Sequence, residues 1–219
     1  MKKRGDSPCN MIIVLALICA AAGLALGGTY HLTRVRIEEQ QRSERMAALR
    51  LVLPDVNKDG FREVATPKSF FATDGKYYEA YDKPLADSSR KLIGYALEAE
   101  GTGYSSTIRV TVGVDSKGEV IRGIKITFQQ ETPGLGANCE AVEVEGTLWD
   151  VLSGKREKTA AREPKFQAQF RGKNLGHFVK VGNKYENIDG LTGATITTNA
   201  VTDAVVAAVR EFKEKVLRK

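Results

Sequence analysis

An uncharged apolar segment near the start of the chain is the strongest constraint on its fold. Residues 11–28 read MIIVLALICAAAGLALGG, and the uncharged stretch continues to Thr33. As a helix this stretch would be about 27–35 Å long, which matches a bilayer hydrocarbon core of about 30 Å. The sequence therefore predicts one transmembrane helix over residues 11–33.

Basic residues precede this segment. Lys2, Lys3 and Arg4 are opposed only by Asp6. Because basic residues that flank a span stay in the cytoplasm, residues 1–10 are predicted to be cytoplasmic. The main part of the chain would then lie on the extracytoplasmic, periplasmic side of the inner or plasma membrane.

Two alternative interpretations of the segment involve cleavage. Ala20–Ala22 offer an A-x-A site for removal of a signal peptide, and Cys19 offers a thiol for lipidation. However, the apolar run continues past the first site, and the bulky Ile18 precedes the cysteine where a small residue is needed. An intact membrane span is the favoured prediction.

The rest of the chain predicts a stalk and an α+β domain. Residues 34–54 are rich in Glu, Gln, Arg, Ala and Leu and end at Pro54, which predicts a stalk helix. Within residues 55–219, strict alternation of apolar residues over 108–114 and 124–128 predicts an antiparallel strand pair. Turn signals at Asp74-Gly75 and Gly182-Asn183 predict two further hairpins, within residues 70–81 and 177–188.

The C-terminal segment predicts an amphipathic helix. Its apolar residues recur at helical spacing on one face, and basic residues occupy the last turns. The apolar positions are Val201, Val205, Ala208, Val209, Phe212 and Val216. The expected architecture is an antiparallel sheet with flanking helices, tethered by one N-terminal helix.

The residue inventory argues against several kinds of site. The three cysteines (Cys9, Cys19 and Cys139) and two histidines (His31 and His177) form no compact ligand set, so no zinc site, iron–sulfur site or intrachain disulfide is expected. The chain has 33 Lys and Arg against 27 Asp and Glu, but no stretch interleaves basic and aromatic residues. Nucleic acid is therefore not an expected partner.

Residues 55–60 resemble the opening of a calcium loop. Asp55, Asn57, Asp59 and Gly60 match its first positions, but the twelfth position is Thr66 where a bidentate Glu is needed. The run is interpreted as a turn between helix and sheet, and no metal site is predicted.

Two segments combine glycines with hydroxyl residues. Residues 131–138 (ETPGLGAN) follow a predicted strand, and residues 189–199 (DGLTGATITTN) open the C-terminal helix. A hydroxyl-rich turn at a helix N-terminus favours an anion such as phosphate, because free N–H groups and the helix dipole converge there. Spacing alone equally allows a simpler interpretation, in which one of three later residues only caps the helix: Thr197, Thr198 or Asn199.

The second segment resembles a flavin-attachment motif. Residues 189–195 (DGLTGAT) are similar to Asp-x-x-Ser/Thr-Gly-Ala-Thr in the G subunit of the Rnf complex and the C subunit of the sodium-translocating NADH:quinone oxidoreductase. Residues 131–136 (ETPGLG) resemble the second signature of these subunits, beside the flavin. The resemblance extends over nearly the whole chain, and its compact length is more similar to the Rnf protein.

The resemblance implies a covalent flavoprotein with an FMN-binding domain. It implies FMN held by a phosphodiester to Thr195 and installed by a flavin transferase, with Thr192, Gly193 and Ala194 forming the recognised turn and phosphate cradle. The implied ring-side residues are Glu131, Thr132, Gly134, Leu135 and Gly136, with Leu135 as the apolar contact.

The implied function is that of an electron carrier. It would work in an ion-translocating ferredoxin:NAD oxidoreductase complex, with other membrane subunits as partners. Three alternatives stay open on the sequence: the homologous quinone-reductase subunit, an extracytoplasmic flavin-binding module without turnover, and an assembly subunit whose Thr and Gly residues only cap helices.

Overall fold

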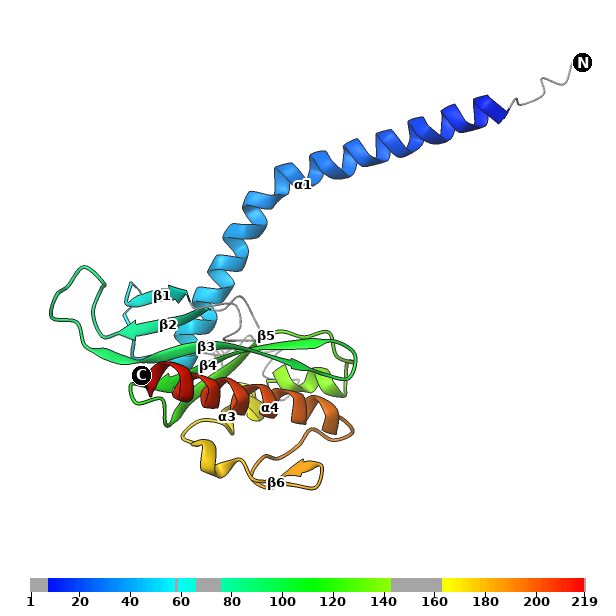
Figure 1. Ribbon diagram of the computed structural model, residues 1–219. Helices are drawn as coiled ribbons and strands as arrows, with labels where there is room; N and C mark the ends of the chain where they lie inside the picture. The colour runs from blue at the N-terminus through cyan, green and yellow to red at the C-terminus, as the bar shows by residue number, and fades with distance from the viewer. Residues whose placement is uncertain (1–7, 58, 66–75, 143–162, 219) are drawn as a thin grey trace, which may run out of the picture. The chain divides into compact units, whose positions relative to one another are not determined.

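The computed structural model describes residues 8–57, 59–65, 76–142 and 163–218. It divides into two compact units, residues 1–45 and residues 46–219, which share the first helix. This helix, α1 (Pro8–Val52), covers the predicted membrane and stalk segments without interruption (Figure 1). It ends just before Pro54, as expected because proline restricts the residue before it and cannot continue a helix.

Within the described residues, α1 is the one helix long and apolar enough to cross a membrane. The qualifying stretch, Asn10–Val52, contains a window of mean hydropathy 2.5 of which none is buried in the protein. Its large apolar side chains over residues 11–37 are exposed. By length and composition this helix suits a bilayer, where such side chains would contact lipid.

The second unit contains a five-stranded antiparallel sheet in which every strand pairs with its neighbour in the sequence (Figure 1). The predicted pair over 108–114 and 124–128 is confirmed: Val112 lies opposite Ile124. The strands are β1 (Phe61–Ala65), β2 (Lys76–Tyr81), β3 (Leu92–Thr102), β4 (Thr107–Asp115) and β5 (Ile121–Phe128).

The predicted hairpin over residues 70–81 is only partly testable. β2 supplies its second strand and pairs with β1, whereas Asp74-Gly75 and the first aromatic run lie outside the described residues. The other predicted hairpin is present but short. It consists of β6 (Lys180–Val181) and β7 (Lys184–Tyr185), and Gly182 between them has φ +59°.

Helix α4 (Thr195–Phe212) covers one face of the sheet, as Figure 1 shows. The predicted apolar face is confirmed, because Val201, Val205 and Val209 are fully buried against β3 and β4. A Cβ at Gly101 of β3 would lie 2.4 Å from the carbonyl oxygen of Ala200, so glycine there allows close packing of helix on sheet.

The opposite face of the sheet is covered by the last turns of α1. Leu49, Val52 and Leu53 form a second buried cluster, together with residues of β1, β2 and β3. A Cβ at Gly113 of β4 would lie 2.7 Å from the carbonyl oxygen of Val52, so the helix end packs directly on the strand. The sheet is therefore the middle layer of the second unit.

Short elements complete the unit beyond β5. The first two, η1 (Gly136–Glu140) and α3 (Lys165–Ala168), follow β5 in the chain. They are followed by η2 (Leu175–His177), and α4 continues into a π-helical turn, η3 (Lys213–Leu217). The first glycine-rich segment ends in η1, and the second ends in α4. Figure 1 shows η1 beside the N-terminal end of α4.

Candidate functional site

The structure brings the two glycine-rich segments into contact. A Cβ at Gly193 would lie 3.0 Å from Cδ2 of Leu135, so the leucine packs directly on the turn before α4. Leu135 nevertheless keeps 45% of its surface exposed. Its side chain therefore offers an apolar surface to a ligand beside the start of α4.

The N-terminus of α4 has no side-chain cap. The N-cap residue is Ala194, and the helix begins at Thr195 itself. Among the residues that the structure describes, no hydrogen bond from the N–H groups of Thr195, Ile196 or Thr197 is present. These free donors and the positive end of the helix dipole favour a bound anion at this position.

The interpretation of Thr197, Thr198 or Asn199 as helix caps is wrong. The helix begins before all three, and their side chains are buried and bonded elsewhere. The hydroxyl of Thr198 donates to the Ala194 carbonyl at 3.0 Å and accepts from the Leu191 backbone amide at 3.0 Å. The side-chain Nδ2 of Asn199 donates to the Asn183 carbonyl at 2.9 Å.

The turn between Asp189 and Thr195 is fixed at both ends. The Gln169 side chain accepts from the Asp189 amide at 2.7 Å and donates to its carbonyl at 3.1 Å. Near the helix, the Ala194 amide donates to the Leu191 carbonyl at 3.0 Å, and Gly193 has φ +73°. Such a positive φ favours glycine at this position.

The predicted site residues of this turn differ in exposure. Thr192 and Gly193 are exposed and Thr195 is half-buried, whereas Ala194 is buried. Part of Thr195 therefore remains accessible to solvent. The missing side chain of Gly193 allows the close contact with Leu135.

The first segment forms a tight loop that leads into η1. The Leu135 and Ala137 amides both donate to the Thr132 carbonyl, at 3.1 and 3.2 Å. Gly134 has φ +77°, and beyond its chain neighbours no atom of a described residue lies within 4 Å of the position of its missing Cβ. Thr132, Gly134 and Leu135 are exposed, whereas Glu131 and Gly136 are buried.

Glu131 has four hydrogen-bond donors around its carboxylate. Oε1 accepts from the amides of Ser105 and Ser106 at 2.9 and 3.1 Å, and Oε2 accepts from the Tyr104 amide at 3.2 Å and the Thr197 hydroxyl at 2.5 Å. Burial by itself raises the pKa of Glu131, but these hydrogen bonds to the charged form outweigh it and lower the pKa. The carboxylate is therefore an ionised acceptor.

Sequence reasoning missed the residues that support the site from outside the two segments. Gln167 is fully buried; its Nε2 donates to the Cys139 carbonyl at 3.0 Å, and its Oε1 accepts from the Ile126 amide at 3.4 Å. Gln167 thus fixes η1 to β5. No local pattern distinguishes it from an exposed glutamine, although its position among apolar residues (KFQAQF) is a weak signal.

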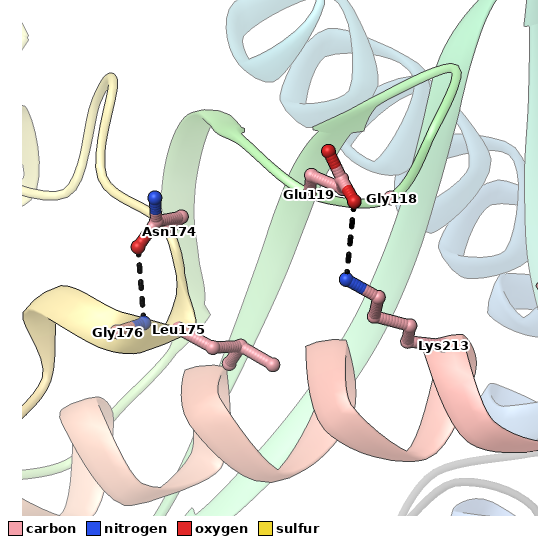
Figure 2. Close-up of a pocket in the computed structure, with 6 residues that line it drawn as sticks. All are labelled: Gly118, Glu119, Asn174, Leu175, Gly176 and Lys213. Carbon is pink, nitrogen blue, oxygen red and sulfur yellow. Dashed lines mark hydrogen bonds and ion pairs between the residues drawn. The ribbon is translucent and has the colours of Figure 1, made fainter.

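Figure 2 shows a pocket elsewhere on the second unit. It is lined by Gly118, Glu119, Asn174, Leu175, Gly176 and Lys213. Its volume of about 240 Å³ is below the roughly 300–1,000 Å³ of typical ligand sites. Lys213 and Glu119 form an ion pair of 3.3 Å, and the Gly176 amide donates to the Asn174 side chain at 3.0 Å. None of the predicted site residues is among those that line this pocket.

Comparison with known proteins identifies the class of the domain. Residues 103–210 match the FMN-binding domain family. The matched region contains both glycine-rich segments and all the predicted site residues.

Relatives over nearly the full chain identify the family. The chain is 33% identical over 205 residues to the G subunit of the ion-translocating oxidoreductase complex of Aliivibrio fischeri, covering 92% of this chain and 88% of the relative. It is 29% identical to the G subunit of the proton-translocating ferredoxin:NAD(+) oxidoreductase complex of Clostridium ljungdahlii, covering 90% and 87%. The chain belongs to this family of G subunits and is a membrane-anchored member of it.

A solved structure is also similar in part. It is the C subunit of the Na(+)-translocating NADH-quinone reductase of Parabacteroides distasonis, which is 21% identical with a TM-score of 0.46. The match covers 81% of this chain and 94% of that one.

The residues at the start of α4 fit an FMN phosphate. Free N–H groups of the first turn are available for its oxygens, and the Thr195 hydroxyl lies at the same helix end. The exposed Leu135 side chain, in contact with Gly193, suits an apolar ring nearby.

Proposed function

We propose that this protein is the FMN-carrying electron-transfer subunit of a membrane-bound, ion-translocating ferredoxin:NAD oxidoreductase complex of the Rnf type. The observation that carries the proposal is the uncapped N-terminus of α4, which begins at Thr195 inside a matched FMN-binding domain. FMN, when bound, supplies the exchange of electrons, while the protein sets its position and surroundings. Other subunits of the complex are its partners.

The attachment point in this proposal is the hydroxyl of Thr195, through a phosphodiester to FMN. The first amides of α4 would bond the phosphate oxygens, and the helix dipole would stabilise the remaining negative charge. Thr192, Gly193 and Ala194 would form the turn that a flavin transferase recognises. Thr195 is only half-buried, which supports modification of its hydroxyl on the folded domain.

The loop over residues 131–136 would lie beside the isoalloxazine ring. Leu135 would supply an apolar contact, because it is exposed and already packs on Gly193. Thr132 and Gly134 are the other exposed members of the loop, while Gly136 allows the loop to pack tightly against α4.

The proposed orientation places residues 1–10 in the cytoplasm and the FMN-binding domain on the periplasmic side. The basic residues Lys2, Lys3 and Arg4 before α1 support it through the positive-inside rule. A covalent bond would prevent loss of FMN from a site that is open to an extracytoplasmic compartment.

Intact-mass measurement of the full chain, co-expressed with a flavin transferase, tests the attachment. We expect wild type to carry one FMN, Thr195→Ala to carry none, and Thr195→Ser to retain part of the adduct because it keeps a hydroxyl. Thr195 makes no side-chain hydrogen bond to another described residue, so its loss should change the free energy of unfolding by about 0.5 kcal/mol or less.

Thr192→Ala tests the alternative attachment point, because Thr192 is an exposed threonine of the same turn. An adduct that persists on Thr195→Ala and disappears on Thr192→Ala would show that the wrong threonine is assigned. FMN that binds but is released by acid denaturation would instead support a non-covalent flavin-binding module.

A further inference from the structure

The Glu131 carboxylate joins three segments that are distant in the sequence. It accepts from the β3–β4 turn, through the amides of Tyr104, Ser105 and Ser106, and from α4, through the hydroxyl of Thr197. Glu131 itself begins the loop that carries Leu135. We call Glu131, these three amides and the Thr197 hydroxyl the Glu131 cluster.

The cluster uses the full acceptor capacity of the carboxylate. An ionised carboxylate has about four lone-pair sites. Each oxygen of Glu131 accepts two hydrogen bonds from protein groups. No site is therefore left for a hydrogen bond from a ligand, and Glu131 is suited to hold protein segments together instead of contacting the flavin.

Close packing encloses the carboxylate. A Cβ at Gly103 would lie 2.6 Å from Oε1, and a Cβ at Gly136 would lie 2.6 Å from the Thr197 hydroxyl and 2.8 Å from Oε2 of Glu131. Only 6% of Glu131 and 1% of Thr197 is exposed. Hydrogen bonds to a charged group in so enclosed a place are strong, because water competes poorly for them.

Thr197 lies two residues after Thr195, in the first turn of α4. Fixing Thr197 to Glu131 therefore fixes the attachment turn relative to the loop that presents Leu135. We propose that Glu131 is a positioning residue, which through Thr197 and the β3–β4 turn sets where the loop of residues 131–136 lies relative to the flavin on Thr195. This inference rests on the proposed function.

Two substitutions break the cluster, and two controls accompany them. Glu131→Gln replaces an oxygen by an NH₂ group that cannot accept, and Thr197→Val removes the hydroxyl while keeping the shape. Thr197→Ser keeps the donor. Thr202→Val is the matched control, because Thr202 is also fully buried on α4, but its hydroxyl donates only to the Thr198 carbonyl, at 2.8 Å.

The first measurement is hydrogen exchange of the full chain in detergent, without flavin. The amides of Leu135 and Ala137, which bond within the loop, should exchange about tenfold faster in Glu131→Gln and Thr197→Val, since a charge-assisted hydrogen bond that fixes the loop is lost. Thr197→Ser and Thr202→Val should leave their exchange as in wild type.

The second measurement is the midpoint potential and visible absorption spectrum of the flavinylated variants. Both should change in Glu131→Gln and Thr197→Val and match wild type in the two controls. Equal potentials and spectra in all five proteins would overturn the positioning role and leave Glu131 a purely structural residue. If Glu131→Gln does not fold, Thr197→Val alone decides the result.

Failure of the proposed function would give a different experimental result from failure of the positioning role of Glu131. A wild-type protein without any FMN adduct after co-expression with the transferase would overturn the attachment proposal. The exchange measurement would still test the Glu131 cluster, and unchanged loop exchange in Thr197→Val would overturn this inference as well.

Discussion

Replacing Gly136 by alanine tests how tightly the two glycine-rich segments are packed. The new Cβ would lie 2.6 Å from the Thr197 hydroxyl and 2.8 Å from both Cβ and Oε2 of Glu131. Gly136 does not have a positive φ, so the cost arises from space alone. To admit the methyl group, the loop must move away from α4, and the hydrogen bond between Thr197 and Glu131 must lengthen.

The expected loss of stability follows from these contacts. Overpacking of a tight site costs about 1–3 kcal/mol, and weakening a hydrogen bond to a charged group adds about 1–2 kcal/mol. We therefore expect Gly136→Ala to lower the free energy of unfolding by about 2–5 kcal/mol. In urea titrations followed by intrinsic fluorescence, this appears as a lower midpoint with an unchanged slope.

Gly190→Ala is the matched control from the other glycine-rich segment. Its Cβ would meet only the Thr198 side chain, at an ordinary distance of 3.6 Å, and Gly190 also lacks a positive φ. We expect no loss of stability, and a gain of up to about 1 kcal/mol because alanine restricts the unfolded chain. Equal stability of Gly136→Ala and wild type would refute the packing argument.

Two further predictions concern pH and topology. The pKa of Glu131 is lowered in the folded protein from its ordinary value of 4.5. The contribution of Glu131 to stability is therefore complete above that pH and is lost as the pH falls through the folded pKa. Urea midpoints measured at decreasing pH should show this loss, and Glu131→Gln should show a smaller pH dependence. A cysteine introduced at Ser88, an exposed residue after β2, should react with a membrane-impermeant thiol reagent in intact cells, and labelling only after lysis would contradict the proposed orientation.

Periodic patterns predict those parts of the fold in which the large apolar side chains share one contact face. The alternation in β4 and β5 and the helical spacing of Val201, Val205 and Val209 indicate the correct elements, because each pattern corresponds to one contact face. The longest strand, β3, has no such pattern. Its sequence LIGYALEAEGT is rich in helix formers, and pairing with β2 and β4 overrides that local preference.

The site is predictable only where it depends on local sequence. The turn over residues 189–195 and the loop over 131–136 are visible as glycine and hydroxyl patterns. The hydrogen bond between Glu131 and Thr197 joins residues 66 positions apart, so no local pattern indicates it. The same distance explains why local sequence suggests Thr197 as a helix cap, since its true partner belongs to another segment.

The threonines at the start of α4 are buried to different degrees, and this would limit which hydroxyl groups can accept the flavin. The segment contains four hydroxyl groups, at Thr192, Thr195, Thr197 and Thr198, but the last two are 1% and 5% exposed. Folding before flavin transfer would thus withdraw half of the possible acceptors, and only Thr195 of the remaining pair lies within the helix. A transferase that meets the folded domain needs to discriminate between two hydroxyls, whereas one that meets the nascent chain must discriminate among four. The order of folding and modification would then help to determine which threonine is modified.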